Sequence, residues 1–215
     1  MYVRHVQGDM EAFRDPQGSA WAEVPREVLD LVPTPSDAQP NRHIRNSLAG
    51  REWGACKSVQ LQALHDGERV YFRLEWTDAT CNERHEEDLF PDAAALLFPM
   101  NGEAALETMG SSEHPVNAWF WRPDIEACPE NLVARGVGTV ERKGPDELES
   151  KSVRDGASWK VVLARPLTDG QPQNGVALKP GQKTSIAVAV WDGSAGERAG
   201  IKAFSQTWRE IELES

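Results

Sequence analysis

The residue types that most often carry out chemistry are scattered along this chain. The histidines do not pair with Asp, Glu or Cys at ligand spacing; they stand at positions 5, 43, 65, 85 and 114. The sequence contains no GxSxG, Walker, GxGxxG or HExxH motif. Since no catalytic group can be assembled from these residues, the sequence predicts a protein that is not an enzyme by itself.

The cysteines are also far apart, at Cys56, Cys81 and Cys128. They form no CxxC or CxxCH motif, which argues against zinc, iron–sulfur clusters and covalently attached c-type haem. Their odd number argues against a pure disulfide framework. One disulfide with a free thiol and three free thiols are both open.

Two glycine-containing loops hold single residues of another kind. ETMGSSEHPVNAWFW (107–121) places Met109 before a tryptophan-rich stretch, and WDGSAGERAGIKAFSQTW (191–208) places Lys202 between Ile201 and Ala203. A lone methionine usually fills a core and a lone lysine is usually solvated. Loops on a rigid scaffold are nevertheless where binding sites tend to be built.

Short stretches of alternating apolar and polar residues, rich in β-branched and aromatic side chains, predict strands separated by turns. Asp-Gly pairs at 66–67, 155–156 and 192–193 are turn signals. We therefore expect an all-β protein, a two-sheet antiparallel β-sandwich with long loops forming a pocket at one end. The predicted strands are 58–64, 70–76, 93–98, 116–121, 132–140, 159–165, 185–191 and 207–213.

The chain is expected to form a single domain, 1–215, in which 1–57 is an irregular segment packed on the sandwich. Prolines at 16, 25, 33, 35 and 40 disfavour helix there and favour an extended segment on the surface. Residues 144–156 are polar and are expected to form a loop or a mobile edge.

Composition narrows the partners. Hydrophobic residues make up 40% of the 215 residues, and the formal net charge is −11 without a basic run. Nucleic acid is therefore not an expected partner. The longest apolar stretch, Ala93–Phe98, is too short for a membrane-spanning helix, so no membrane insertion is expected. The start, MYVRHVQGDMEAF, lacks the apolar core of a secretory signal, which favours either a cytoplasmic protein or a mature form with a replaced Met1.

Six segments resemble the haem b (gamma) subunits of the type II dimethyl sulfoxide reductase-family molybdoenzymes, which include ethylbenzene dehydrogenase, dimethylsulfide dehydrogenase, selenate reductase and chlorate reductase. The similarity runs from about Val59 to the C-terminus, and the WDGSAGERAGIK block is its most specific part. The segments are 64–80, 90–99, 109–127, 130–141, 159–167 and 189–208.

The resemblance implies a β-sandwich that holds one non-covalent haem b through axial methionine and lysine ligands. The matching residues are Met109, in the MG loop before PVNAW, and Lys202, after ERAG. Met100 is a rival for the methionine, and Lys183 and Lys160 are weaker rivals for the lysine. By adjacency to Met109, three further residues are expected to line the haem pocket: Asn117, Trp119 and Trp121.

The ligand chemistry agrees with the resemblance. Lysine ligates iron only through its neutral amine, and burial between apolar neighbours lowers a lysine's pKa. A thioether is a soft ligand that raises the potential of a haem. With both axial positions filled, such a haem passes single electrons and has no position left for oxygen or substrate.

The resemblance also implies partners and a location. These are a catalytic molybdenum subunit, an iron–sulfur subunit and a soluble periplasmic electron carrier such as a c-type cytochrome, all in the periplasm. The alternative function is a haem-free β-sandwich module that binds carbohydrate-type ligands, because eight tryptophans would also suit a sugar-binding face. Such a module would not need Met109 or Lys202.

Overall fold

The computed structural model describes residues 1–39, 41–47, 50–86, 89–143, 147–167 and 175–215. Its helical segments are short: α1 (Met10–Arg14), η1 (Ser19–Glu23), η2 (Ser36–Ala38), α2 (Arg42–Ser47) and η3 (Pro123–Ile125). Its strands are β1 (Tyr2–His5), β2 (Glu27–Pro33), β3 (Ser58–His65), β4 (Arg69–Thr77), β5 (Ala93–Pro99), β6 (Val116–Trp121), β7 (Glu130–Ala134), β8 (Glu141–Arg142), β9 (Glu149–Asp155), β10 (Ser158–Pro166), β11 (Lys183–Trp191), β12 (Ala203–Ser205) and β13 (Arg209–Leu213).

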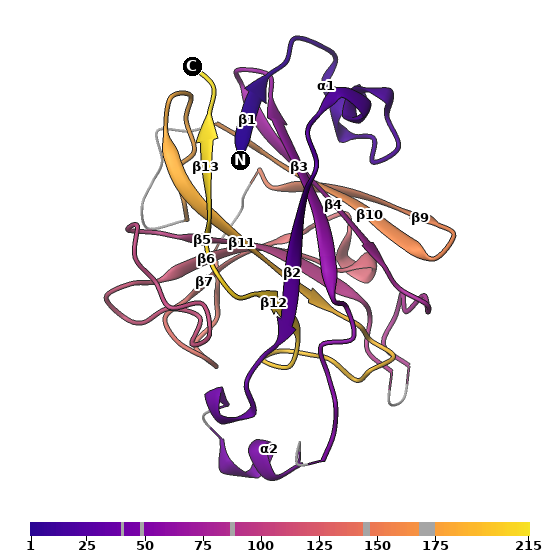
Figure 1. Cartoon of the computed structure of the whole chain (residues 1–215), viewed down its shortest axis with the longest axis vertical. Coiled ribbons are helices and arrows are strands. Elements are labelled where there is room, and N and C mark those ends of the chain that lie inside the picture. Colours follow the sequence, from indigo (N-terminus) through magenta and orange to yellow (C-terminus); the bar gives the residue numbers. More distant parts are fainter. Residues whose placement is uncertain (40, 48–49, 87–88, 144–146, 168–174) are drawn as a thin grey trace.

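One hydrogen-bonded path joins most of these strands, in the order β8-β7-β6-β5-β11-β12-β2-β3-β4-β10-β9. All pairings along it are antiparallel, whereas β1 runs parallel to both β3 and β13. The path folds over so that its two halves face each other, with β2 and β12 at the join (Figure 1). The predicted two-sheet sandwich is confirmed, with β1 as a parallel addition.

The core lies between the two halves and follows the alternation of each strand. Inward-facing residues from β4 and β10 pack against those from β5, β6 and β11. Aromatic contacts join the halves: the rings of Phe72 and Trp119 lie 5.8 Å apart, and those of Trp121 and Trp159 lie 5.2 Å apart. Each such buried side chain contributes roughly 1.5–3 kcal/mol.

The outer faces of the two halves differ in what packs on them. On β4 and β10 the outer face is covered by α1 and η1, through Phe13 and Trp21 packed with Tyr71 and Val162. Asp9 caps α1 by accepting a hydrogen bond from the backbone N–H of Glu11. No described helix covers the outer face of β5, β6 and β11; residues of the loop before β6 and of β12 pack on part of it, and the rest is available for a site.

The eight predicted strands are present, with one changed end. The stretch 132–140 stops being a strand at Ala134, because Gly136 and Gly138 adopt φ angles of 129° and 81° that break the ladder. Residues 149–155, expected in a loop or a mobile edge, form β9, which pairs with β10 as the last strand of the path. Residues 144–146 of that expected loop lie outside the described residues.

The N-terminal segment is more ordered than the prolines predict. Pro25 precedes β2 and Pro33 is its last residue, so both prolines stand at strand ends, where a missing N–H is tolerated. β2 pairs with β3 and β12 and thereby links the two halves.

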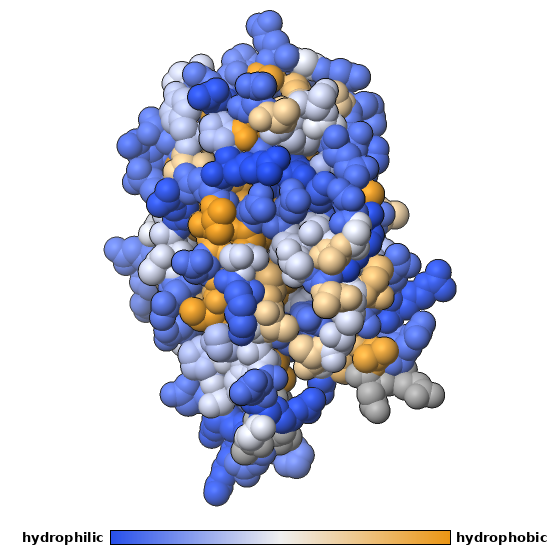
Figure 2. All heavy atoms as spheres, turned by 45° about the vertical axis from the view of Figure 1, so that its right-hand side comes forward, coloured by the Kyte–Doolittle hydropathy of each residue, from blue (hydrophilic) through white to orange (hydrophobic). Residues whose placement is uncertain are grey.

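The described part of the chain has three free thiols and no helix of the length and apolarity needed to span a membrane. Cys56 is buried, whereas Cys81 and Cys128 are exposed. The surface is mostly hydrophilic, with apolar side chains gathered in the middle of the face shown in Figure 2.

Candidate functional site

A cavity of about 530 Å³ lies on the outer face of β5, β6 and β7. The three strands form its floor, and three connections form its walls: the loop before β6, the loop after β7 and the β11–β12 connection. Most of its lining is apolar. Its size falls within the range of roughly 300–1,000 Å³ that is typical of ligand and cofactor pockets.

The floor arises because both faces of these strands are apolar. On β6, Trp119 and Trp121 point into the core, so that Ala118 and Phe120 point into the cavity. Small residues dominate the cavity side, which leaves depth above the sheet. The floor residues are Ala93, Ala95, Leu97, Ala118, Phe120, Leu132 and Ala134.

Met109 enters the cavity from a tight turn before β6. The turn is closed by hydrogen bonds from the N–H of Met109 to the carbonyl of Leu106 (3.0 Å) and from that of Gly110 to Ala105 (2.8 Å). Met109 itself has a φ of 56°, a left-handed conformation that is uncommon outside glycine. Its carbonyl accepts a hydrogen bond from Gly136, which ties this turn to the loop after β7.

Lys202 enters from the β11–β12 connection, directly before β12. Its carbonyl accepts hydrogen bonds from the backbone N–H and the hydroxyl of Thr34, at 2.9 and 3.1 Å. Gln39 donates to the carbonyl of Gly200, and the Trp191 indole donates to that of Ala199. The lysine backbone is therefore held by the segment that follows β2 and by the end of β11.

Glu197 fastens the same connection from inside. The carboxylate is 1% exposed and accepts hydrogen bonds from the backbone N–H groups of Gly54, Ala55 and Asp192. Burial raises its pKa, while these N–H groups lower it. The glutamate of the GERAG sequence thus has a positioning role next to Lys202.

The two side chains meet in the cavity: Lys202 Nζ lies 3.4 Å from Met109 Sδ. The Trp191 ring lies 5.3 Å from the same nitrogen. Lys202 is 5% exposed, and burial lowers its pKa from 10.5 to about 8. Among the described residues, Lys202 Nζ contacts this sulfur and this ring, and no carboxylate lies within ion-pair distance of it. The arrangement presents a soft sulfur and a readily deprotonated amine to one apolar space.

The rival residues lie elsewhere. Met100 and Lys183 line a different cavity, of about 460 Å³, near the other end of β5 and β11. Lys183 is paired there with Glu212 at 3.2 Å, which raises its pKa. Lys160 is paired with Asp155. Because a lysine held as an ammonium cannot donate to a metal, neither has the environment of Lys202.

The three residues expected beside Met109 do not line the cavity. Asn117, Trp119 and Trp121 are buried on the core face of β6. Asn117 donates to Asn131 and Leu132, and accepts from the Trp119 indole at 3.1 Å. Adjacency in sequence was misleading because neighbouring positions of a strand point to opposite faces.

The cavity floor was the part that the sequence analysis missed. Its signal is the row of small apolar residues at alternate positions of 93–97 and 116–121, opposite to a row that already fills a core. A half-buried strand would carry polar residues at these positions. An apolar outer face therefore marks a strand that is covered or that binds an apolar group.

The family model for ethylbenzene dehydrogenase matches residues 19–155 and 148–203, which together include Met109 and Lys202. This chain belongs to the ethylbenzene dehydrogenase family. The chlorate reductase subunit gamma of Ideonella dechloratans is 36% identical over 91% of this chain and 78% of its own length. A protein of Haloferax mediterranei named as a respiratory nitrate reductase haem subunit is 31% identical over 90% of this chain and 66% of its own length.

The similarity to solved structures supports only the fold of this family member. A carbohydrate binding module of family 9 from Caldicellulosiruptor kristjanssonii, in complex with glucose, matches with a TM-score of 0.56 and 12% identity. The match covers 100% of this chain and 95% of that one. At this identity the likeness shows a shared β-sandwich and does not carry over a ligand.

Proposed function

We propose that this chain is the haem-carrying electron-transfer subunit of a molybdenum oxidoreductase and is not an enzyme by itself. One non-covalent haem b would occupy the cavity on β5–β7, with Met109 Sδ and Lys202 Nζ as the axial ligands. The observation that carries the proposal is the 3.4 Å approach of these two donors, 93 residues apart in the sequence, within one apolar cavity.

The donor set fits such a group. The amine of Lys202 is buried, has a lowered pKa and is free of a carboxylate partner in the described part of the chain, so it can reach the neutral form that donates to iron. Met109 supplies a neutral thioether, which favours the reduced state of iron. The apolar floor suits a flat macrocycle, and the absence of CxxCH fits a non-covalent b-type group.

Two arginines suit the charged edge of a haem. Arg122 and Arg198 both line the cavity. Arg198 is exposed and lies over the Phe90 ring at 4.3 Å, and Arg122 is anchored by Asp124. Guanidinium groups recognise carboxylates well, so these two residues would hold the propionates.

A bound haem would supply one-electron Fe(II)/Fe(III) chemistry. Met109 and Lys202 would both be engaged in holding the haem, so the site would serve electron transfer and not the binding of oxygen or substrate, and the apolar walls would keep water away. The chain would relay electrons between the iron–sulfur subunit of a periplasmic complex and a soluble carrier such as a c-type cytochrome. Relatives that are subunits of chlorate and nitrate reductases support this assembly.

Absorption spectroscopy of the purified protein tests the proposal. The oxidised and dithionite-reduced forms should each show sharp low-spin bands, and pyridine should give the derivative of an extractable b haem. The reduced form should return to the oxidised spectrum with one electron removed per chain. A colourless protein that takes up no added haemin would contradict the proposal and favour a carbohydrate-type binding module.

A further inference from the structure

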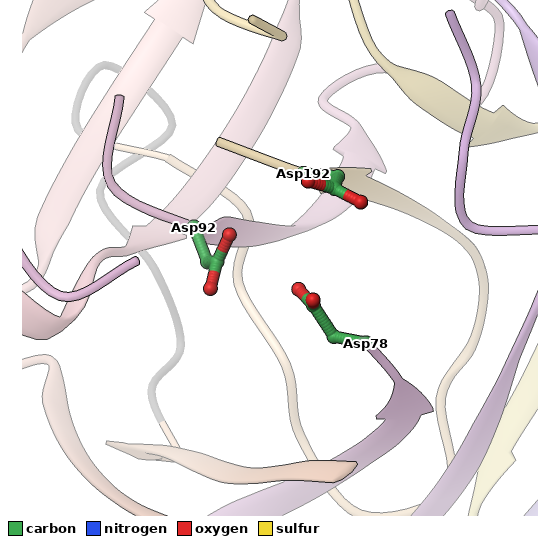
Figure 3. A group of neighbouring side chains, drawn as sticks. All are labelled: Asp78, Asp92 and Asp192. Atoms are coloured by element: carbon green, nitrogen blue, oxygen red, sulfur yellow. The ribbon is translucent and has the colours of Figure 1, made fainter. Parts of the chain in front are cut away.

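Three carboxylates converge at the base of the cavity loops, outside the haem cavity itself. Asp78 follows β4, Asp92 precedes β5 and Asp192 follows β11. Each offers one oxygen to a group whose members all lie within 4.8 Å of one another. Figure 3 shows the Asp78 side chain pointing toward the other two, and the three side chains come from separate segments of the chain.

Two members of the group are removed from water: Asp92 is 0% exposed and Asp78 is 5% exposed, while Asp192 is partly buried. Burial raises the pKa of Asp92 to about 6, although hydrogen bonds from the N–H groups of Asn82 and Gly193 and from the Trp159 indole oppose this. Burial also raises the pKa of Asp78. Two buried acids with a third, partly buried one this close are costly as anions unless a cation or further donors balance them.

The protein's own donors satisfy Asp92 and bind Asp192 Oδ1, but they leave one oxygen of Asp78 without a partner among the described residues. Asp78 Oδ1 accepts from the N–H and hydroxyl of Thr80, but Asp78 Oδ2 is buried and has no hydrogen-bond partner among the described residues. Asn82, whose N–H donates to Asp92, carries a second such buried acceptor, its Oδ1. Arg154 approaches, but its guanidinium donates to the backbone carbonyl of Asp78. Arg154 Nη1 is also buried without a partner among the described residues, but the two unpaired atoms on Asp78 and Asn82 are oxygen acceptors, which is what a cation requires.

We propose that Asp78, Asp92 and Asp192 bind a calcium ion. Calcium takes six to eight oxygen ligands from carboxylates, amide and backbone carbonyls and water, with flexible geometry. The three carboxylates provide oxygen donors of this kind, and water would complete the set. The described part of this site offers neither histidine nor cysteine, so a softer transition metal is less suited.

The ion would fasten the strands that build the haem cavity. Asp92 directly precedes Ala93 of the cavity floor, and Asp192 directly follows Trp191, whose ring lies over Lys202. The segments are already in close contact, because a Cβ on Gly193 would lie 1.7 Å from the Phe90 carbonyl oxygen. A calcium ion here would hold the loop ends of β4, β5 and β11 together. The binding of calcium does not rest on the proposed haem function.

Calcium binding can be measured on the haem-free and haem-loaded full-length protein, after treatment with a chelator. Calcium chloride is added up to about 10 mM, above the range of roughly 10⁻⁴–10⁻³ M seen for extracellular calcium modules. We expect one calcium per chain by elemental analysis. At about 100 times the Kd, we expect the Tm to rise by about 5–10 °C, and magnesium should be less effective. No binding by the wild-type protein over this range would overturn the proposal.

Asp78→Asn is the informative variant, because it removes the charge while its amide oxygen can keep the Thr80 contacts. It should weaken calcium binding at least about tenfold, whereas exposed Asp37→Asn should bind as the wild type does. In chelator, Asp78→Asn should be as stable as the wild type or more so, since a buried charge is gone. Undiminished calcium binding by Asp78→Asn, or its destabilisation in chelator, would overturn the assignment. Because neither readout uses haem, failure here is distinct from failure of the haem proposal.

Discussion

The molecule contains two cavities that each combine a methionine with a lysine, and they differ in what surrounds the lysine. Lys202 is buried beside Met109 Sδ with a pKa lowered to about 8. Lys183, in the cavity that also contains Met100, is exposed and paired with Glu212 and Glu210, which raises its pKa. Residue types alone therefore do not define a ligand pair. Burial without a counter-charge lowers the pKa of Lys202 and favours its neutral amine, whereas the two glutamates keep Lys183 an ammonium.

The largest expected difference between the cavities is the effect of removing each lysine. Lys202→Ala should weaken haem binding by more than about 100-fold, since even groups behind a metal ligand are worth roughly 10–100-fold. Lys183→Ala should leave haem binding unchanged. Titration of each variant with haemin, followed at the Soret band, measures both. Equal losses in the two variants would remove the distinction between the cavities.

The methionines should differ in the same direction but by less. Met109→Ala should raise the haem Kd about tenfold or more and open a coordination position, whereas Met100→Ala should do neither. Met109→His should keep haem and lower its midpoint potential, because imidazole is a more basic ligand than a thioether. Spectroelectrochemical titration compares the potentials. An unchanged potential in Met109→His would show that the thioether is not a ligand.

The burial of Lys202 should be visible in the haem-free protein as a pH-dependent cost. The folded state has a pKa of about 8 and the unfolded state one of 10.5, so between these values the unfolded chain binds more protons and stability rises with pH. Lys202→Met should therefore be more stable than the wild type by about 3 kcal/mol at pH 7. That gain should shrink as the pH rises from 8 toward 10.5.

Denaturant unfolding at several pH values measures this gain, and Lys183→Met is the matched control. Lys183 is exposed, so its substitution should show no gain that shrinks with alkaline pH. A Lys202→Met gain that is constant from pH 7 to 10 would mean that Lys202 is not held in an unfavourable charged state.

The smallest expected effect concerns the floor of the cavity. Ala118→Ser would place a hydroxyl on the apolar floor and should weaken haem binding about two- to fivefold, since burying such a group costs on the order of 0.5–1 kcal/mol. Ser185→Ala, in the polar second cavity, should have no effect. The same haemin titration resolves both. A larger loss of haem binding in Ser185→Ala than in Ala118→Ser would indicate that the haem binds in the second cavity.

The strands of the sandwich could be predicted because alternation and Asp-Gly turns act locally. Residues 58–64 and 159–165, for example, fall within β3 and β10. β2 and β9 were not predicted, since prolines in one case and polar side chains in the other hide strands that are stabilised by pairing with distant partners.

The candidate site shows a similar limit. The resemblance pointed to Met109 and Lys202, and the structure brings them together across 93 residues. It does not place Asn117, Trp119 and Trp121 beside them, because the pleat turns these side chains into the core. The Asp78, Asp92 and Asp192 group was invisible in the sequence, since three single aspartates at three strand ends form no motif until the sheet is assembled.

The most direct test of the account compares two double variants with the wild type by absorption spectroscopy after haemin addition. The Met100→Ala/Lys183→Ala protein and the wild type should each bind one haem with sharp low-spin bands in the oxidised and reduced states. The Met109→Ala/Lys202→Ala protein should bind haem weakly or give high-spin bands. Wild-type spectra from the Met109→Ala/Lys202→Ala protein would contradict the account, because the iron would then be held by other residues.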